Sequence, residues 1–269
     1  MLMDFTKMTA AGNDFVLVDN RAQKIRLTPE QVVLLCHRQN GVGADGIILL
    51  VPCASGRADW TWQFYNSDGS VAEMCGNGAR CFARFVQKLT GAKEKLTFET
   101  GAGIISADFH GERVTVNLTQ PKDLRLEEKI NLSIGTQVVH SLNTGVPHAV
   151  LFVPDADQAM VQQLGREIRQ HPHFAPKGTN VNFVQRLATG SIRVRTYERG
   201  VEGETLACGT GVTASALVSA RLHQFASPVK VQVQSGEELE VSFQNRNGEF
   251  SDVRLTGPAD FIFEGKIEI

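Results

Sequence analysis

The feature that most constrains this chain is an internal repeat. Two segments with a cysteine followed by Gly-x-Gly lie 133 residues apart, Met74–Ala79 and Ala207–Val212. Two further pairs of similar segments follow the same order at offsets of 132 and 134: Phe64–Asn66 with Thr196–Glu198, and Val16–Val18 with Val150–Phe152. Any one pair has a simple alternative, since short apolar strands resemble one another. The shared order and offset indicate a duplicated unit of about 130 residues.

The repeat also predicts where the halves meet. The stretch Pro121–Asn143 lies between the two copies and is polar and charged, so the boundary is expected there. We therefore expect a first domain over residues 1–121 and a second over residues 122–256. Domains of this size are common in soluble proteins.

The segments between the motifs indicate an α+β fold. Short β-rich or apolar runs, bounded by Gly, Pro, Asn and Asp, outnumber the helical patterns. Strands are expected at residues 3–8, 14–19, 47–51, 61–65, 96–100, 103–109, 113–118, 149–153, 182–185, 192–197, 229–233, 239–243, 253–256 and 261–264. Many short strands with few long helices argue against a doubly wound parallel sheet.

Helix signals are few and specific. Thr28-Pro29-Glu30-Gln31 has the composition of a capping box with proline in the first turn. Apolar residues recur at helical spacing after Gly78 and end at Gly91, a residue suited to a C-cap. The run Val212–Leu222 is small and apolar nearly all round, which predicts a helix buried on most sides. Asp155 is expected to cap a helix that ends before His171-Pro172.

Charge and hydropathy exclude several classes of function. With 27 Lys and Arg against 29 Asp and Glu, the formal charge is −2, so the chain has no global field for capturing nucleic acid. No apolar run approaches the ~18 residues that a membrane-spanning helix needs. The N-terminus also lacks the apolar core of a signal peptide, which favours a cytoplasmic location.

Five cysteines are too few and too scattered for a disulfide framework or a zinc site. They form no CxxC pair and no cluster with histidine. Cys36 and Cys81 lie among helical apolar residues and are expected in the core, and Cys53 lies in a turn. No metal site is predicted.

The remaining two cysteines, Cys75 and Cys208, begin the two motif helices. A thiolate at a helix N-terminus is stabilised by the helix dipole and by free N–H groups. The same N–H groups form a site for a carboxylate, and the glycines allow a close approach. Two such units facing one small acid suit inversion at the carbon next to its carboxylate, which needs one ionised and one protonated acid/base group. No lysine lies in a recognisable cofactor motif, so nothing in the residues favours a pyridoxal enzyme.

The motifs as a whole closely resemble diaminopimelate epimerase. The resemblance is carried by Asn66–Gly69, Met74–Cys81, Tyr197–Gly200, Glu204–Gly211, Gly12–Phe15 and Pro147–Ala149, and it spans essentially the whole chain. It implies an enzyme that converts LL-diaminopimelate to the meso isomer without a cofactor, using a thiolate and a thiol. It also implies two similar domains, each a strand-rich barrel around a central helix, with the active site between them. The last strand of the family returns to the first domain, which would add residues 257–269 to it.

The resemblance also implies roles for individual residues. Cys75 and Cys208 would be the acid/base pair, and His148 and Glu198 would help poise them and bind the α-amino group. The α-carboxylate would be held by backbone N–H groups of Gly76, Asn77, Gly209 and Thr210. The far end of the substrate would be bound by Asn13, Asn66, Asn180 and Arg199. Simpler interpretations stay open for three of these: a surface ion pair for Glu198, and ordinary turn positions for Asn13 and Asn180.

The chain departs from the family in three places, and these bear on substrate choice. Val146 stands where some members have asparagine, Gly46 where some have glutamine, and Thr9-Ala10-Ala11 replaces a more usual His-Gly start.

A proline racemase of the same fold is the nearest alternative function, although Asn77 replaces the histidine typical of that group. A phenazine-biosynthesis isomerase would lack the cysteine pair. A non-catalytic thiol redox or acid-binding protein is the alternative from another class. A homodimer is possible, and no nucleic-acid or membrane partner is expected.

Overall fold

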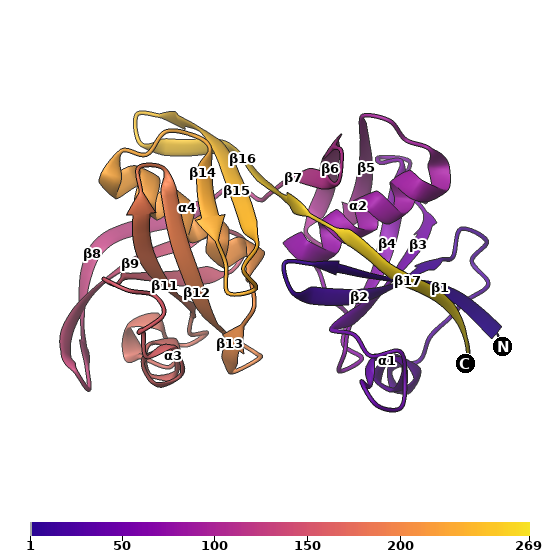
Figure 1. Cartoon of the computed structure of the whole chain (residues 1–269), viewed down its shortest axis with the longest axis horizontal. Coiled ribbons are helices and arrows are strands. Elements are labelled where there is room, and N and C mark those ends of the chain that lie inside the picture. The colour runs from indigo at the N-terminus through magenta and orange to yellow at the C-terminus, as the bar shows by residue number, and fades with distance from the viewer. Residues whose placement is uncertain (1) are drawn as a thin grey trace. The chain divides into compact units, whose positions relative to one another are not determined.

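The structure is a computed structural model that describes residues 2–269, and it separates into two compact units. The first unit holds the described residues up to Asn117 together with Gly257–Ile269, and the second holds Leu118–Thr256. In Figure 1 the first unit carries the indigo and magenta strands, and the yellow C-terminal strand runs beside its N-terminal strand.

The first unit is built from eight strands in one continuous order. The strands are β1 (Leu2–Ala10), β2 (Asn13–Asp19), β3 (Gly46–Pro52), β4 (Trp60–Asn66), β5 (Lys95–Thr100), β6 (Gly103–His110), β7 (Arg113–Asn117) and β17 (Asp260–Glu268). Their pairing order is β17-β1-β2-β3-β4-β5-β6-β7. The pairs β2–β3 and β4–β5 are parallel and the other pairs are antiparallel.

The second unit has the same plan. Its strands are β8 (Lys122–Leu132), β9 (Gly135–Asn143), β10 (Pro147–Phe152), β11 (Asn180–Ala188), β12 (Ser191–Glu198), β13 (Gly203–Thr205), β14 (Val229–Gln232), β15 (Glu238–Arg246) and β16 (Glu249–Pro258). The pairing order is β8-β9-β10-β11-β12-β14-β15-β16, with β13 added beside β12. Again two pairs, β10–β11 and β12–β14, are parallel.

The two pairing orders match strand for strand, so the repeat predicted from the sequence is confirmed at the level of topology. The parallel pairs fall in the same places, and each is joined by a helix, as parallel neighbours require a crossover. The C-terminal strand β17 occupies beside β1 the position that β8 occupies beside β9. The fold is the expected strand-rich α+β arrangement with few helices.

Each unit has one helix surrounded by its strands. In the first unit α2 (Gly76–Thr90) contacts β1, β2, β3, β6 and β7, and in the second α4 (Gly209–His223) contacts β9, β10, β11, β12, β14 and β15. Helix α4 is buried almost all round, as its small apolar sequence predicts. Helix α2 ends at Gly91, whose φ of 72° lies in the left-handed region that glycine adopts readily.

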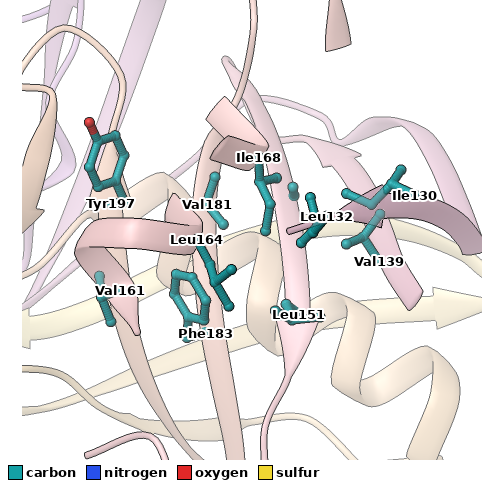
Figure 2. Close-up of a cluster of buried hydrophobic side chains, with 11 residues drawn as sticks. Ile130, Leu132, Val139, Leu151, Val161, Leu164, Ile168, Val181, Phe183 and Tyr197 are labelled. Atoms are coloured by element: carbon teal, nitrogen blue, oxygen red, sulfur yellow. The ribbon is translucent and has the colours of Figure 1, made fainter. Parts of the chain in front are cut away.

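A second, shorter helix in each unit covers another part of the sheet. Helix α1 (Pro29–Cys36) packs with apolar residues of β1, β2 and β3, and helix α3 (Val161–Arg169) packs with those of β9 to β12. Figure 2 shows Val161, Leu164 and Ile168 of α3 in the apolar cluster of the second unit. Burial of such a cluster is the main stabilising contribution to each unit.

One predicted cap is confirmed and one is wrong. The Thr28 side chain accepts a hydrogen bond from the Gln31 N–H while Gln31 bonds back to the Thr28 N–H, the expected capping box. Asp155 does not cap α3, because the helix begins six residues later, at Val161, and its N-cap residue is Met160. The Asp155 carboxylate instead accepts from the N–H of Asp157 within a local turn.

The polar stretch at the expected boundary is not a linker. Residues 122–143 form the antiparallel pair β8–β9, and Ile130, Leu132 and Val139 are buried in the second unit's cluster. The apolar residues on β8 alternate with polar ones, which is the period of a half-buried strand. Within residues 2–269, no helix is both long and apolar enough to cross a membrane.

Candidate active site

Cys75 lies at the N-cap of the buried helix α2, as the sequence predicts. Its backbone is extended, with φ −144° and ψ 123°, and its Sγ accepts a hydrogen bond from the Gly78 N–H at 3.5 Å. The side chain is half-buried. An N-cap acceptor stabilises the first turn of a helix, and here the acceptor is a thiol sulfur.

Cys208 occupies the matching position at the N-cap of α4. Its backbone is also extended, with φ −118° and ψ 108°, but its side chain does not form the helix-capping hydrogen bond that Cys75 forms. The Sγ instead lies 3.4 Å from the hydroxyl Oγ1 of Thr210. Cys208 is buried, with 8% of its surface exposed. Both predicted acid/base thiols therefore start a central helix, with different local partners.

In the first unit, the strand register brings two predicted site residues, Asn13 and Asn66, and the departing position Gly46 to the edge where α2 begins. Asn13 starts β2, Gly46 starts β3, and Asn66 ends β4 directly opposite Gly46. The chain then turns from Asn66 towards Cys75. Asn66 is exposed, and its Nδ2 donates to the Ser70 hydroxyl at 3.0 Å.

The same edge of the second unit holds the other predicted positions. His148 on β10 is the register partner of Asn180 on β11, and the neighbouring strand β12 ends at Glu198. The Asn180 Oδ1 accepts from the Arg199 N–H at 2.8 Å, which ties the end of β12 to the start of β11. The structure thus groups His148, Asn180, Glu198 and Arg199 within one unit.

The side chains of Glu198 and Arg199 contact other elements of the second unit. The Glu198 Oε2 accepts from the Thr205 hydroxyl at 2.9 Å, and the Arg199 Nη1 donates to the Lys177 carbonyl at 3.3 Å. Thr210 is held through its carbonyl, which accepts from the Thr144 hydroxyl at 2.9 Å. Of these contacts, only the one between Thr144 and Thr210 reaches the first turn of α4.

His148 is almost fully buried, with 1% exposed, and its neutral form is strongly favoured. Burial, and to a lesser extent the charge of Arg199, lower the pKa of His148 from 6.5 to about 3. Its Nδ1 lies 3.2 Å from the Asn182 Nδ2, and its Nε2 has no hydrogen-bond partner among the described residues. A buried ring nitrogen of this kind is suited to a bound ligand.

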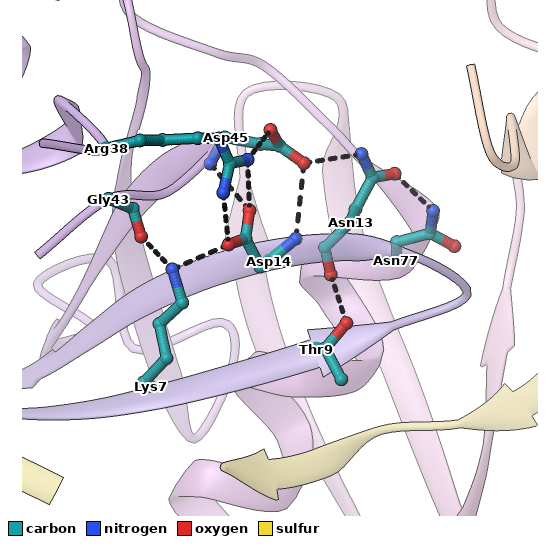
Figure 3. A network of polar contacts seen from close by, with 8 residues as sticks. All are labelled: Lys7, Thr9, Asn13, Asp14, Arg38, Gly43, Asp45 and Asn77. Atoms are coloured by element: carbon teal, nitrogen blue, oxygen red, sulfur yellow. Dashed lines mark hydrogen bonds and ion pairs between the residues drawn. The ribbon is translucent and has the colours of Figure 1, made fainter. Parts of the chain in front are cut away.

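Around Asn77 the structure shows a polar network that the sequence did not predict. Figure 3 follows it from Asn77, whose Nδ2 donates to the Asn13 Oδ1 at 2.5 Å, to Asp45, which accepts from the Asn13 Nδ2 at 2.9 Å. Asn13 therefore uses both ends of its amide inside the unit. On the other side of Asn77, the buried Arg80 donates to the Asn77 Oδ1 at 2.8 Å.

The network continues into a cluster of charges. Arg38 donates to both Asp14 and Asp45, and Lys7 pairs with Asp14 at 2.7 Å. Burial alone would raise the pKa of Asp14, but hydrogen bonds from Arg38 and Lys7 hold it below its usual 3.8. Asp14 and Arg80 lie within recognised motifs but had no predicted role. The other three members, Lys7, Arg38 and Asp45, lie outside the motifs, and the fold brings all five together from separate parts of the chain.

The other cysteines lie outside this arrangement. Cys36 and Cys81 are buried in the first unit, as predicted, and burial raises the pKa of the Cys36 thiol to about 12. Cys53 is half-buried in its loop, with Sγ 3.3 Å from the Ser55 hydroxyl. Within residues 2–269, no group of three His, Cys, Asp or Glu side chains is arranged to hold a metal ion.

Gly46 is closely packed between β3 and β4. A Cβ at this position would lie 2.6 Å from the Tyr65 carbonyl oxygen and 2.9 Å from the Phe64 ring. Both distances are shorter than a real Cβ contact, so no side chain fits here without a shift of the backbone. Glycine at residue 46 is therefore imposed by the packing of β3 against β4.

The chain matches known proteins along its length. The family model for diaminopimelate epimerase matches twice, over residues 5–123 and 140–262, which again confirms the repeat. A diaminopimelate epimerase from Aquifex aeolicus is 46% identical over 277 aligned residues, covering 98% of each chain.

Two solved structures share the fold at low sequence identity. A phenazine biosynthesis protein of the PhzF family from Bacillus anthracis has a TM-score of 0.76 at 16% identity, covering 100% of each chain. A hydroxyproline epimerase from Agrobacterium vitis has a TM-score of 0.72 at 18% identity, covering 99% of this chain and 92% of the other. The family match over both halves and the full-length relative together show that the chain belongs to the diaminopimelate epimerase family.

Proposed function

We propose that this protein interconverts LL- and meso-diaminopimelate, with Cys75 and Cys208 as its two acid/base groups. Family membership makes it an isomerase, and the relatives that cover the whole chain are diaminopimelate epimerases. The reaction belongs to lysine and cell-wall precursor biosynthesis. One cysteine thiolate removes the proton from the α-carbon, and the electron pair left behind is delocalised into the carboxylate. The thiol of the other cysteine then delivers its proton to the opposite face, so the two sulfurs exchange protonation states.

The observation that carries this proposal is the paired N-cap position of the two cysteines. Each starts a helix that is buried at the centre of its unit, so the dipole of that helix favours the thiolate form. Two equivalent thiols are what a two-base inversion needs, since each must act as acid in one direction and as base in the other.

The first turns of the same helices supply the carboxylate site. The N–H groups of Gly76, Asn77, Gly209 and Thr210 belong to helix N-termini, which bind anions. Negative charge on the α-carboxylate grows as the proton leaves. Donors fixed before the reaction stabilise that charge without reorganisation.

The remaining predicted residues have supporting positions. His148 lies on β10 and Glu198 ends β12, two strands that flank β11 and contact α4. There His148 would poise a thiol, and Glu198 would help to poise it and bind the α-amino group. The far end of the substrate would be bound by Asn13 and Asn66 of the first unit and by Asn180 and Arg199 of the second. A guanidinium such as that of Arg199 can bind the distal carboxylate at two points. The reaction needs no cofactor, because the thiols and N–H groups provide the required acid, base and anion stabilisation.

The decisive experiment measures hydrogen exchange at the α-carbon. The purified enzyme in D2O is given LL-diaminopimelate or, in a parallel sample, L-proline, and NMR follows deuterium incorporation. We expect incorporation with formation of the meso isomer from diaminopimelate, and none from proline. Exchange with proline and not with diaminopimelate would favour the racemase alternative, and no exchange with either would favour a binding protein.

The same assay tests the two thiols. Cys75→Ala and Cys208→Ala are each expected to abolish epimerisation, while Cys53→Ala, which changes a half-buried loop cysteine, is the matched control. Near-normal turnover in either of the first two variants would contradict the two-thiol mechanism.

The proposal also includes a cytoplasmic location and a homodimeric state. Light scattering of the purified protein measures the oligomeric state.

A further inference from the structure

The inference concerns the protonation of His148, and it rests on the proposed function only for its effect on catalysis. The ring of His148 is held between β11 and the first turn of α4. Its Cε1 lies 3.3 Å from where a Cβ of Gly211 would be, three residues after Cys208. Glycine at residue 211 leaves room for the ring and for the Asn182 side chain, whose Oδ1 would lie 2.2 Å from such a Cβ.

The amide of Asn182 has a single orientation in this site. Its Nδ2 is 3.0 Å from the carbonyl oxygen of Ala149, which can only accept a hydrogen bond. Its Oδ1 accepts from the Thr196 hydroxyl at 3.0 Å. A reversed amide would set its own oxygen against the Ala149 carbonyl, with both groups fully buried. The nitrogen must therefore face Ala149, and the same nitrogen faces His148.

The orientation of Asn182 decides which ring nitrogen of His148 carries the proton. The Asn182 Nδ2 lies 3.2 Å from the His148 Nδ1, and an amide N–H2 group can only donate. The Nδ1 must therefore accept, and a neutral imidazole that accepts at Nδ1 carries its hydrogen on Nε2. We infer that Asn182 is a positioning residue that holds His148 as the Nε2–H tautomer, with this buried N–H presented as a hydrogen-bond donor to an anionic group of the bound substrate or of the thiol pair.

Two observations support a ligand-facing role for this N–H. The Nε2 is buried and has no hydrogen-bond partner in the part of the chain that the structure describes. A buried donor left without a partner is costly, so such a group in a native site is normally completed by a ligand or ordered water. A donor at Nε2 also matches a carboxylate or a thiolate, and it does not match an ammonium group, which can only donate.

The tautomer is measured directly by NMR of protein labelled with 15N in its histidine rings. We expect the signals of His148, assigned by their loss in His148→Gln, to show an unprotonated Nδ1 and a protonated Nε2 at pH 7.5 in the unliganded enzyme. A protonated Nδ1, or a mixture of the two tautomers, would overturn the inference. This measurement needs no variant at Asn182, so a folding defect there cannot hide the answer.

A variant then tests whether Asn182 sets the tautomer. Asn182→Asp replaces the donor with an isosteric acceptor, which favours a proton on Nδ1. We expect the Nδ1 signal to become protonated and kcat to fall by up to about 10⁴-fold, as when the orienting partner of a catalytic histidine is changed so that the wrong tautomer forms. An unchanged tautomer in a folded Asn182→Asp protein would show that another group holds the ring.

Thr196→Val is the matched control, because it removes the other hydrogen bond of the same amide and leaves Nδ2 in place. We expect it to lower stability, to keep the Nε2–H tautomer and to keep kcat within about threefold. A tautomer change in Thr196→Val would contradict the special role of Nδ2. The NMR measurement and the epimerase assay test the two claims independently. The expected tautomer in a protein without epimerase activity would contradict the proposed function alone. The opposite tautomer in an active epimerase would contradict this inference alone.

Discussion

The guanidinium of Arg80 donates a hydrogen bond to the Asn77 side chain at 2.8 Å, although Arg80 is 0% exposed. The same side chain donates to the carbonyls of Gly76 at 3.3 Å and Pro258 at 3.2 Å. Arg80 therefore ties the first turn of α2, where the carboxylate site is proposed, to the C-terminal segment of the same unit. Its three acceptors diverge around one planar group, which suits arginine and no other residue.

Arg80→Lys is expected to lower the free energy of unfolding by about 3 kcal/mol, because the single ammonium of lysine cannot reach all three acceptors and leaves buried groups unsatisfied. The catalytic efficiency kcat/KM should fall as well, since the Asn77 amide loses its anchor. Arg84→Lys, one turn further along α2 and only half-buried, is the control and should cost less than about 1 kcal/mol. Urea denaturation measures both, and equal losses would show that Arg80 has no special role.

Gly211→Ala is expected to be damaging, while Gly78→Ala, at the matching place of the other helix, should be close to neutral. A Cβ at residue 211 would lie 2.2 Å from the Asn182 Oδ1, and that oxygen is held in place. At residue 78 the nearest atom is a methyl of Ile48 at 3.2 Å, which can move. Overpacking of the first kind costs about 2 kcal/mol.

The two alanine variants are compared with Gly203→Ala, where a Cβ meets nothing within 4 Å. Thermal unfolding gives the stability of each protein, and the epimerase assay gives kcat. We expect Gly211→Ala alone to lose both stability and turnover, because it displaces Asn182 and the His148 ring. Equal effects of Gly78→Ala and Gly211→Ala would contradict the expectation that only residue 211 is packed too closely for a Cβ.

Burial of His148 predicts a loss of stability in mild acid. Its pKa is about 3 in the folded protein, against 6.5 for an unperturbed histidine such as that of the unfolded chain, so between these values the unfolded state binds the extra proton. The contribution of His148 to stability is complete above about pH 6.5 and is lost as the pH falls towards 3. Between pH 7 and pH 5 this loss amounts to about 2 kcal/mol.

The variant that tests this is His148→Gln, which removes the titrating group. Its free energy of unfolding, measured by urea at pH 7 and pH 5, should fall less over this range than that of the unmodified protein, by about 2 kcal/mol. His110→Gln changes an exposed histidine and should leave the difference as it is. The same acid sensitivity in His148→Gln would show that other groups cause it.

Arg199→Lys should weaken substrate binding although it keeps the charge. Lysine cannot reproduce the planar two-point contact of a guanidinium with a carboxylate, so KM for diaminopimelate should rise about tenfold or more with a smaller change in kcat. Arg166→Lys on helix α3 is the control. A KM that stays the same in Arg199→Lys would remove this residue from the proposed site.

Local pattern was sufficient for the repeat, the two cysteine N-caps and the Thr28 capping box. The repeat is visible because short similar segments recur in the same order about 133 residues apart. The two N-cap positions and the capping box each depend on residues a few positions apart, within one turn of helix. The β8–β9 pair also had a local signal, the alternation of Leu124, Leu126, Ile130 and Leu132 with polar residues, which the charge of the segment obscured. Asp155 failed as a cap because a good capping residue does not by itself decide where a helix begins.

Contacts between distant residues were decided only by the tertiary structure. The sequence names His148 as a site residue, but the partner that fixes its ring is Asn182, 34 positions later, and their contact depends on the parallel register of β10 and β11. Arg80 reaches Pro258 across 178 positions for the same reason. A sequence motif shows which residue types the chemistry needs. The neighbours that orient those residues depend on strand register and packing. Burial of apolar residues across the whole unit sets the register and the packing, and no local stretch of sequence does so.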